Sequence, residues 1–199
     1  ASTPAEALAI LRDWQVAVPA SVTAALSRPS GVVRPDDPRL SRVENVIYAA
    51  PAHSLAAAAQ LARDSGCKVR ILGDALQGEA RAVAAAMAAQ ALAEQAKCRP
   101  EDPPFLLLSG GELTVTRRGA GIGGPNAEFC LALALALNGA AGIHALACDT
   151  DGVDGAAEVA GAIIGPETLT LARGRGIDPA AALATNDAHS FFAAIGGQV

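Results

Sequence analysis

Short apolar runs alternate with longer alanine-rich stretches between residues 43 and 97 of this chain. The alternation predicts strand, helix, strand and helix over Val43–Ala49, His53–Ser65, Lys68–Leu72 and Gly78–Lys97. Strands joined by helices of this length form βαβ units, in which the strands lie parallel. Hydrophobic residues make up 51% of the chain and aromatic residues only 3%, so the core must be built from Ala, Leu, Val and Ile. Both features predict an α/β fold with mostly parallel sheets and flanking helices.

A proline-rich segment is the best candidate for a domain boundary. Residues 99–104 read Arg-Pro-Glu-Asp-Pro-Pro, and prolines at this density end a helix and stiffen a linker. We expect residues 1–100 to be the remainder of an N-terminal α/β domain, and residues 101–199 to be a C-terminal α/β domain. The further elements expected are helices Pro4–Trp14, Pro19–Ser27, Asn126–Asn138, Glu167–Arg173, Pro179–Ala184 and His189–Ala194, and strands Phe105–Leu108, Leu113–Thr116 and Ile143–Ala147.

Charge and cysteine usage exclude several classes of partner and compartment. The formal net charge of −5 argues against nucleic acid or an anionic membrane as a partner. The longest fully apolar run, Phe129–Leu137, is far shorter than the roughly 20 residues of a membrane span. The four cysteines are widely spaced without a CxxC pair, and we interpret Cys130 and Cys148 as small core residues. This usage predicts a reducing compartment, the cytoplasm.

Three glycine-rich or acidic turns lie within about fifty residues, each where a strand is expected to end. They are Ser109-Gly110-Gly111-Glu112, the glycine cluster at 119–124, and Asp-Thr-Asp-Gly-Val-Asp-Gly at 149–155. Glycines leave backbone N–H groups free to hold an anion, and clustered carboxylates can hold a hard cation. Together the turns predict a cleft that handles a phosphorylated ligand with a divalent metal.

Two of these turns have structural alternatives. Gly123-Gly124-Pro125-Asn126 leads into a helix whose first N–H groups point back at the loop, as in a phosphate site; the alternative is a turn followed by a capped helix. Asp149, Asp151 and Asp154 are candidate Mg²⁺ ligands, and they resemble the start of an EF-hand. Val153 and Ala160 stand at its fifth and twelfth positions, which excludes that motif and leaves a tight Asx-turn as the alternative.

Nucleotide-binding fingerprints match only in part. Gly73 and Gly78 have the spacing of a P-loop, but Glu79 and Ala80 stand where that motif needs Lys and Ser or Thr; we expect a helix start there instead. Gly119, Gly121 and Gly124 match G-x-G-x-x-G, which favours a dinucleotide site. Arg117-Arg118 before the first glycine and Pro125 after the last one make that loop too long for a Rossmann turn, so nicotinamide binding is the weaker alternative.

The histidines predict no catalytic triad or zinc site. His53, His144 and His189 are far apart in the sequence, and we expect helix caps or surface positions for them. Asn186-Asp187 is predicted to be a helix N-cap.

Read together, three segments resemble the MOFRL family, the glycerate 2-kinase family often labelled hydroxypyruvate reductase. They are Leu108-Ser-Gly-Gly-Glu-Leu-Thr-Val, then Gly-x-Gly-Gly-x-Asn126-x-Glu128, then Asp149-Thr-Asp-Gly-Val-Asp-Gly. The resemblance is specific from Phe105 onward, and residues 71–80 are similar to the preceding part of the same proteins.

The resemblance implies ATP-dependent, Mg²⁺-assisted phosphorylation of D-glycerate to 2-phosphoglycerate. It also implies a two-domain Rossmann-like architecture with the site in the cleft between the domains. Ser109, Gly110, Gly111 and Glu112 would line the cleft for substrate or nucleotide. Phosphate or substrate would be held by Gly123, Gly124, Asn126 and Glu128, and metal by Asp149, Asp151 and Asp154.

Two departures from the family pattern matter. Pro125 stands where the family loop has an arginine, and losing such a cation can cost several kcal/mol of barrier in phosphoryl transfer, so the catalytic residue is not assigned. Family proteins are also roughly twice this long, so we expect the chain to be a piece whose partner is the missing N-terminal portion, with a homo-oligomer also open. The alternatives are an NAD(P)-dependent hydroxypyruvate reductase and a non-catalytic remnant.

Overall fold

The computed structural model describes residues 3–199. It divides into two compact units, Ala1–Tyr48 and Ala49–Val199. This division differs from the boundary expected at residues 100 and 101. The reason is that the two longest strands, one on each side of the proline-rich segment, pair with each other.

The first unit contains two short helices, α1 (Pro4–Asp13) and α2 (Ala20–Leu26), and a 3₁₀ turn, η1 (Pro38–Leu40). Helix α1 begins with a capping box, in which Thr3 and Glu6 bond each other's backbone N–H groups. None of these three elements has a buried residue. The unit therefore has little core of its own.

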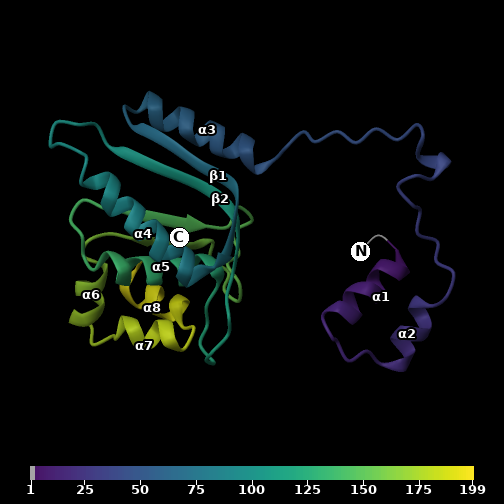
Figure 1. The fold of residues 1–199 in the computed structure, drawn as a ribbon. Helices are drawn as coiled ribbons and strands as arrows, with labels where there is room; N and C mark the ends of the chain where they lie inside the picture. Colours follow the sequence, from purple (N-terminus) through teal and green to yellow (C-terminus); the bar gives the residue numbers. More distant parts are fainter. Residues whose placement is uncertain (1–2) are drawn as a thin grey trace. The chain divides into compact units, whose positions relative to one another are not determined.

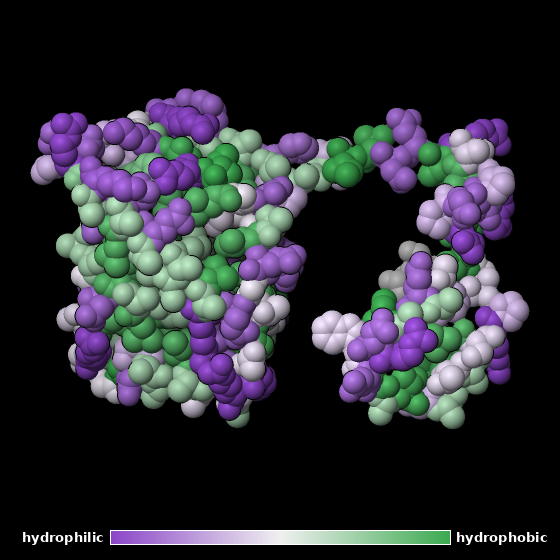
Figure 2. Space-filling view, viewed as in Figure 1, coloured by the Kyte–Doolittle hydropathy of each residue, from purple (hydrophilic) through white to green (hydrophobic). Residues whose placement is uncertain are grey.

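The strand predicted at Val43–Ala49 is wrong for this structure. The segment is not assigned to any strand, and a strand requires a neighbour for its N–H and C=O groups. Val46, Ile47 and Tyr48 are 71%, 79% and 92% exposed. Figure 2 shows apolar side chains in full view along the segment that leads into the second unit.

The second unit is built on a two-stranded parallel sheet of β1 (Lys68–Glu79) and β2 (Phe105–Thr114). Helix α3 (Pro51–Asp64) packs on one side of this sheet, and α4 (Ala80–Gln95) lies on the other (Figure 1). The strand predicted over Lys68–Leu72 continues to Glu79, with register shifts on either side of Gly73, and the helix predicted from Gly78 begins at Ala80. The two strands predicted within residues 105–116 are one strand, because Gly111 pairs with Leu76 at its centre.

A second sheet, antiparallel, consists of β3 (Ala145–Cys148) and β4 (Gly161–Ile164). Strand β4 was not predicted, because its four residues are too few to show a period. Its backbone is also paired toward the chain end, where Ile163 N–H donates to Gly197 C=O. Mixed α/β architecture with a parallel sheet and flanking helices confirms the predicted fold class, although the second sheet is antiparallel.

Helix α5 (Pro125–Leu137) lies at the centre of this unit, with nine of its 13 residues buried. Around it lie α6 (Thr168–Gly174), α7 (Pro179–Ala184) and α8 (Ala188–Ile195) (Figure 1). The buried core is mostly Ala and Leu, as the composition predicted, and Phe191 and Phe192 add a T-shaped aromatic pair. No helix within residues 3–199 is both long and apolar enough to cross a membrane.

Gly111 is a position at which the β1–β2 pairing leaves no room for a side chain. Its φ is +152°, and a Cβ placed there would lie 2.0 Å from Leu76 O. We expect Gly111→Ala to lower the free energy of unfolding by about 2 kcal/mol or more, through backbone strain and lost pairing. Urea denaturation measures this.

Gly174 provides the control, because a Cβ there meets nothing within 4 Å and it ends α6. Gly174→Ala should change stability by less than about 1 kcal/mol. Equal effects of the two substitutions would contradict the register of β1 against β2.

Candidate functional site

Two of the three predicted turns, 109–112 and 149–155, meet the first residues of α5 at one small cavity, while the glycine cluster at 119–124 does not line it. The cavity has a volume of about 60 Å³, and its lining comes from the second half of β2, the start of α5 and the end of β3: Gly111, Glu112, Leu113, Pro125, Asn126, Cys148 and Asp149. These segments are up to 38 positions apart in the sequence (149 − 111 = 38). The fold therefore gathers Glu112, Asn126 and Asp149 in one place, as the motifs predicted.

The cavity presents acceptor oxygens. Glu112 and Asp149 are exposed carboxylates, and no Lys, Arg or His is among the lining residues. Asn126 Nδ2 donates to Asp149 Oδ2 at 3.4 Å and to Asp154 Oδ1 at 3.2 Å, which commits both amide hydrogens and leaves Asn126 Oδ1 as an acceptor. Such a set suits a cation or a hydroxyl donor, and it repels an anion.

The acidic side chains around Asp149 affect its ionisation. Partial burial is the largest cause that raises the pKa of Asp149, and the negative charges of Asp151, Asp154 and Glu112 raise it further. Like charges held near each other disfavour the ionised form. A bound cation would relieve that repulsion.

Asp154 lies behind the cavity and caps α5. Its side chain is 0% exposed, and its carboxylate accepts the N–H groups of Asn126 at 2.9 Å and Ala127 at 2.8 Å. Pro125 has no N–H group, and Glu128 N–H already donates to Gly124 C=O. Every N–H group at the start of α5 is thus used, so the phosphate site predicted at this helix end is occupied by the protein's own carboxylate. The alternative, a turn followed by a capped helix, is what the structure forms.

His189 is the second partner of Asp154. Its Nε2 lies 2.8 Å from Asp154 C=O and 3.2 Å from Asp154 Oδ2, and its side chain is 2% exposed. The predicted surface or cap position for His189 is therefore wrong, since α8 turns this face into the core. The hydrogen bond to the Asp154 carboxylate raises the pKa of His189. Burial alone would raise the pKa of Asp154, but hydrogen bonds from His189, Asn126 and Ala127 outweigh it and hold that pKa below its usual value.

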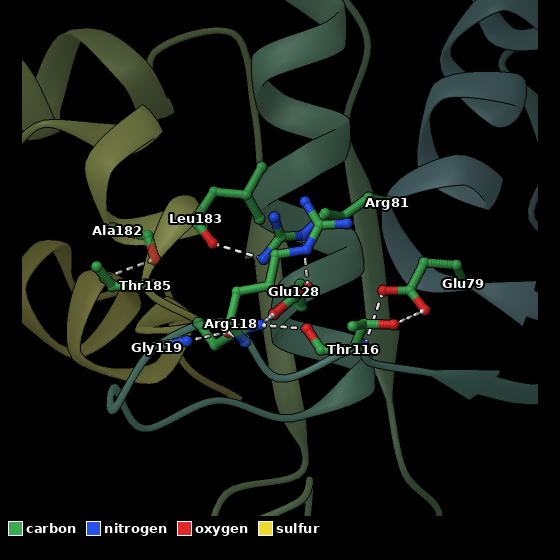
Figure 3. Close-up of polar contacts among 10 residues, drawn as sticks. Glu79, Arg81, Thr116, Arg118, Gly119, Glu128, Ala182, Leu183 and Thr185 are labelled. Carbon is green, nitrogen blue, oxygen red and sulfur yellow. Dashed lines mark hydrogen bonds and ion pairs between the residues drawn. The ribbon is translucent and has the colours of Figure 1, made fainter.

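Glu128 belongs to a buried network and does not reach the cavity lining. Its carboxylate accepts Arg81 Nε at 2.7 Å and Asn186 Nδ2 at 2.8 Å, with 1% of its side chain exposed. Arg81 also donates to Leu183 C=O, and Figure 3 shows the arginine joining α4, α5 and α7. The predicted role of Glu128 in holding phosphate or substrate is thus replaced by one in packing these helices together.

Asn186 was predicted as part of an N-cap and has a larger role. It has a φ of +56°, and its Oδ1 accepts the N–H groups of Arg118 and Gly119. Neither Asn186 nor Arg81 could be assigned to this network from sequence. The one signal was Arg81 itself, an isolated charge in an alanine-rich helix.

The glycine-rich loop packs against the chain itself. A Cβ at Gly121 would lie 2.5 Å from Asp187 Cβ, and one at Gly124 would lie 2.4 Å from Asp154 Cγ. Gly121 N–H also donates to Thr185 C=O, and Asp187 accepts Ile122 N–H. Gly119 and Gly123 approach residues 185 and 186 in the same way. Close backbone contact accounts for the glycines in this loop.

The remaining predicted residues lie around the cavity or apart from it. Ser109 and Gly110 are half-buried within β2 and are not lining residues. Asp151 is exposed, and its Oδ1 accepts Val153 N–H at 3.0 Å in the Asx-turn named as the alternative. Within residues 3–199, no group of three or more His, Cys, Asp and Glu side chains is arranged to hold a metal ion. The three aspartates therefore do not form a preassembled metal site here.

The two cysteines interpreted as core residues differ. Cys130 is buried, and burial raises its pKa to about 12. Cys148 is exposed and lines the cavity, so its predicted core position is wrong. It lies on the outward-facing side of β3, next to Asp149.

Glu112→Gln tests the electrostatic coupling in the cavity. Removing that charge removes one cause of the raised pKa of Asp149, so the pKa of Asp149 should fall in a carboxyl ¹³C NMR titration. Glu158→Gln, an exposed carboxylate in the same loop as Asp149, should leave it unchanged. If Glu112→Gln leaves the pKa of Asp149 unchanged, the two carboxylates are not electrostatically coupled.

Known proteins match this chain over all of its length and support the resemblance seen in the motifs. The MOFRL family model matches residues 105–199. A "Putative hydroxypyruvate reductase" of Agrobacterium vitis is 43% identical, covering 100% of this chain and 45% of its own. A "D-glycerate 2-kinase" of Thermotoga maritima is 31% identical over 95% of this chain and 44% of its own.

Solved structures agree with the sequence matches. The crystal structure of a glycerate kinase from Thermotoga maritima has a TM-score of 0.78 with this chain at 30% identity, covering 99% of this chain and 46% of that one. The chain spans less than half the length of these relatives. With the family model, the relatives and the fold in agreement, residues 105–199 belong to the MOFRL family.

Proposed function

We propose that this chain is part of a kinase that transfers a phosphoryl group from ATP to D-glycerate with the help of Mg²⁺, giving 2-phosphoglycerate. The observation that carries the proposal is the cavity at which Glu112, Asn126 and Asp149 meet. Relatives named as glycerate kinases support the reaction class. Phosphoryl transfer needs positioning and charge neutralisation more than covalent chemistry by the protein, and a small polar cavity can contribute to both.

The cavity fits Mg²⁺ by its donor chemistry. Mg²⁺ prefers oxygen ligands and is usually held by one or two carboxylates, with water and substrate phosphate completing its shell. Glu112 and Asp149 would supply those carboxylates; partial burial first, and then the nearby negative charges, raise the pKa of Asp149. The ion would supply charge neutralisation at the transferring group. Asp151, which is exposed nearby in sequence, is the next candidate ligand.

Asn126 gives the cavity a neutral acceptor. With its Nδ2 committed to Asp149 and Asp154, its Oδ1 can accept a hydrogen bond from a hydroxyl group such as those of D-glycerate. The acceptor can orient a hydroxy acid without adding charge.

The triphosphate of ATP does not fit the residues predicted for it in this chain. The N–H groups at the start of α5 are bonded to Asp154, and the cavity has no basic lining residue. We propose that the positively charged side chain that neutralises the phosphates, and the main nucleotide contacts, come from the part of the protein that lies outside this chain. The relatives are more than twice as long, and the exposed apolar side chains of residues 46–48 offer a surface for that part to cover.

An NAD(P)-dependent hydroxypyruvate reductase is the second candidate, favoured by the names of two relatives. Two observations count against it: Asp154 occupies the helix end where a pyrophosphate would bind, and residues 185–187 fill the space beside the glycines. Titration of the protein with NADH or NADPH, followed by cofactor fluorescence, distinguishes the reductase from the kinase. Saturable binding below millimolar cofactor would favour the reductase.

Glu112→Gln and Asp149→Asn test the kinase assignment in the full-length protein. Wild type should form ADP only when D-glycerate and Mg²⁺ are present. Each variant should lower kcat by about 10²-fold, the typical loss of one charge-stabilising group, while Glu158→Gln should match wild type. ADP formation independent of D-glycerate, or variants as active as wild type, would contradict the proposal.

Pro125→Arg tests whether the kinase lacks a cation at this position. Pro125 lines the cavity at the first position of α5, so an arginine there would bring a positive charge to a cavity of acceptors. Because we propose that this charge is supplied from outside this chain, we expect the KM for ATP, measured by initial rates, to stay close to that of wild type. Pro125→Gln is the uncharged control. A KM for ATP lowered about tenfold in Pro125→Arg alone, the effect of one added charge-assisted hydrogen bond, would show that the charge is not supplied elsewhere, and full inactivity of every variant would favour a non-catalytic remnant.

A further inference from the structure

Asp154 is saturated with hydrogen bonds from two helices, α5 and α8. Its Oδ1 accepts the backbone N–H and the side-chain Nδ2 of Asn126, at 2.9 and 3.2 Å. Its Oδ2 accepts Ala127 N–H at 2.8 Å and lies 3.2 Å from His189 Nε2. A carboxylate has about four lone-pair sites, so all of them are in use. A fully buried carboxylate in this state has no free oxygen for a metal ion or a substrate.

The helix end that Asp154 occupies would otherwise attract an anion. Free N–H groups and the positive end of the helix dipole make a helix N-terminus an anion-binding site. In this chain that end is α5, which supplies Pro125 and Asn126 to the cavity. Because the protein's own carboxylate is fixed there, the helix end no longer attracts phosphate.

The same contacts fix the orientation of Asn126. Asp154 draws the amide nitrogen of Asn126 inward, and Asp149 accepts from that nitrogen on the other side. If Asp154 were neutral or absent, the amide could turn over and present N–H groups to the cavity. The direction of this one side chain decides whether the cavity offers only acceptors.

We infer that Asp154 is a positioning residue that sets the ligand selectivity of the cavity: by filling the N-terminus of α5 and orienting Asn126, it excludes anions and leaves a site for a cation or a hydroxyl group. Asp154 does this without contacting the ligand. This role replaces the metal-ligand role that the sequence suggested for it, and it holds whether or not the chain belongs to a kinase.

Inorganic phosphate is the probe, and the ¹⁵N-labelled chain of 199 residues is the protein tested. In Asp154→Ala, phosphate in the millimolar range should shift the backbone amide resonances of Asn126 and Ala127 in a saturable way, because those N–H groups are then free. In wild type the same two resonances should not move. Phosphate-dependent shifts of both amides in both proteins, or in neither, would overturn the inference.

Asp154→Asn is the second variant, for the case in which the alanine variant does not fold. It keeps the volume of the side chain and still blocks phosphate, so the readout is hydrogen exchange of the Asn126 side-chain amide. That exchange should be at least about tenfold faster than in wild type, because a bond to a charged acceptor is replaced by a weaker one.

Two controls separate this role from loss of charge or of stability. Glu158→Gln removes a charge from the same loop, and Ala172→Gly weakens α6 at a buried position away from the cavity. Both should leave Asn126 side-chain exchange at the wild-type rate. Exchange that stays at the wild-type rate in Asp154→Asn, or rises equally in Ala172→Gly, would contradict a positioning role.

Discussion

The bond between the Asp154 carboxylate and the first N–H groups of α5 is the interaction on which the rest of the second unit depends. Helix α5 is the centre of the core of the second unit, and its first two residues line the same cavity as Glu112 and Asp149. An uncapped end there would leave the buried Ala127 N–H and the half-buried Asn126 N–H without partners, and an unpaired buried donor costs about 1–3 kcal/mol. With Asp154 in place, the loop at 149–155 is tied to α5, and through His189 both are tied to α8.

The glycine-rich loop illustrates how one sequence signal can have two physical causes. Glycines before a helix permit close approach, and the approaching group can be a phosphate or another part of the chain. Here Asp154 and residues 185–187 occupy that space. The G-x-G-x-x-G spacing and the apparent phosphate loop are therefore both consequences of intramolecular packing. The cavity that results is lined by Glu112, Asn126 and Asp149, whose side-chain oxygens are hydrogen-bond acceptors.

The features that could be predicted from the sequence are those that depend on local pattern, above all the helices. All the α-helices of the second unit were predicted to within a few residues, since apolar period and proline starts are local signals. The convergence of Glu112, Asn126 and Asp149 was predicted from turns expected after strands, although only Asp149 follows a strand, since Glu112 lies within β2 and Asn126 in the first turn of α5. The strand at Val43–Ala49 failed, because β-propensity cannot supply a partner strand. The roles of Glu128 and His189 were missed, because burial of a charge depends on partners 58 and 35 positions away in the sequence, Asn186 and Asp154.

Paramagnetic relaxation by Mn²⁺, which substitutes for Mg²⁺ at oxygen sites, tests most directly whether these turns form one cation site. At substoichiometric Mn²⁺, the amide signals of Glu112, Asn126 and Asp149 should broaden together and before the signals of other carboxylate-rich segments. Broadening that began at a distant acidic segment, or that affected only one of the three residues, would contradict a single cation site at this cavity.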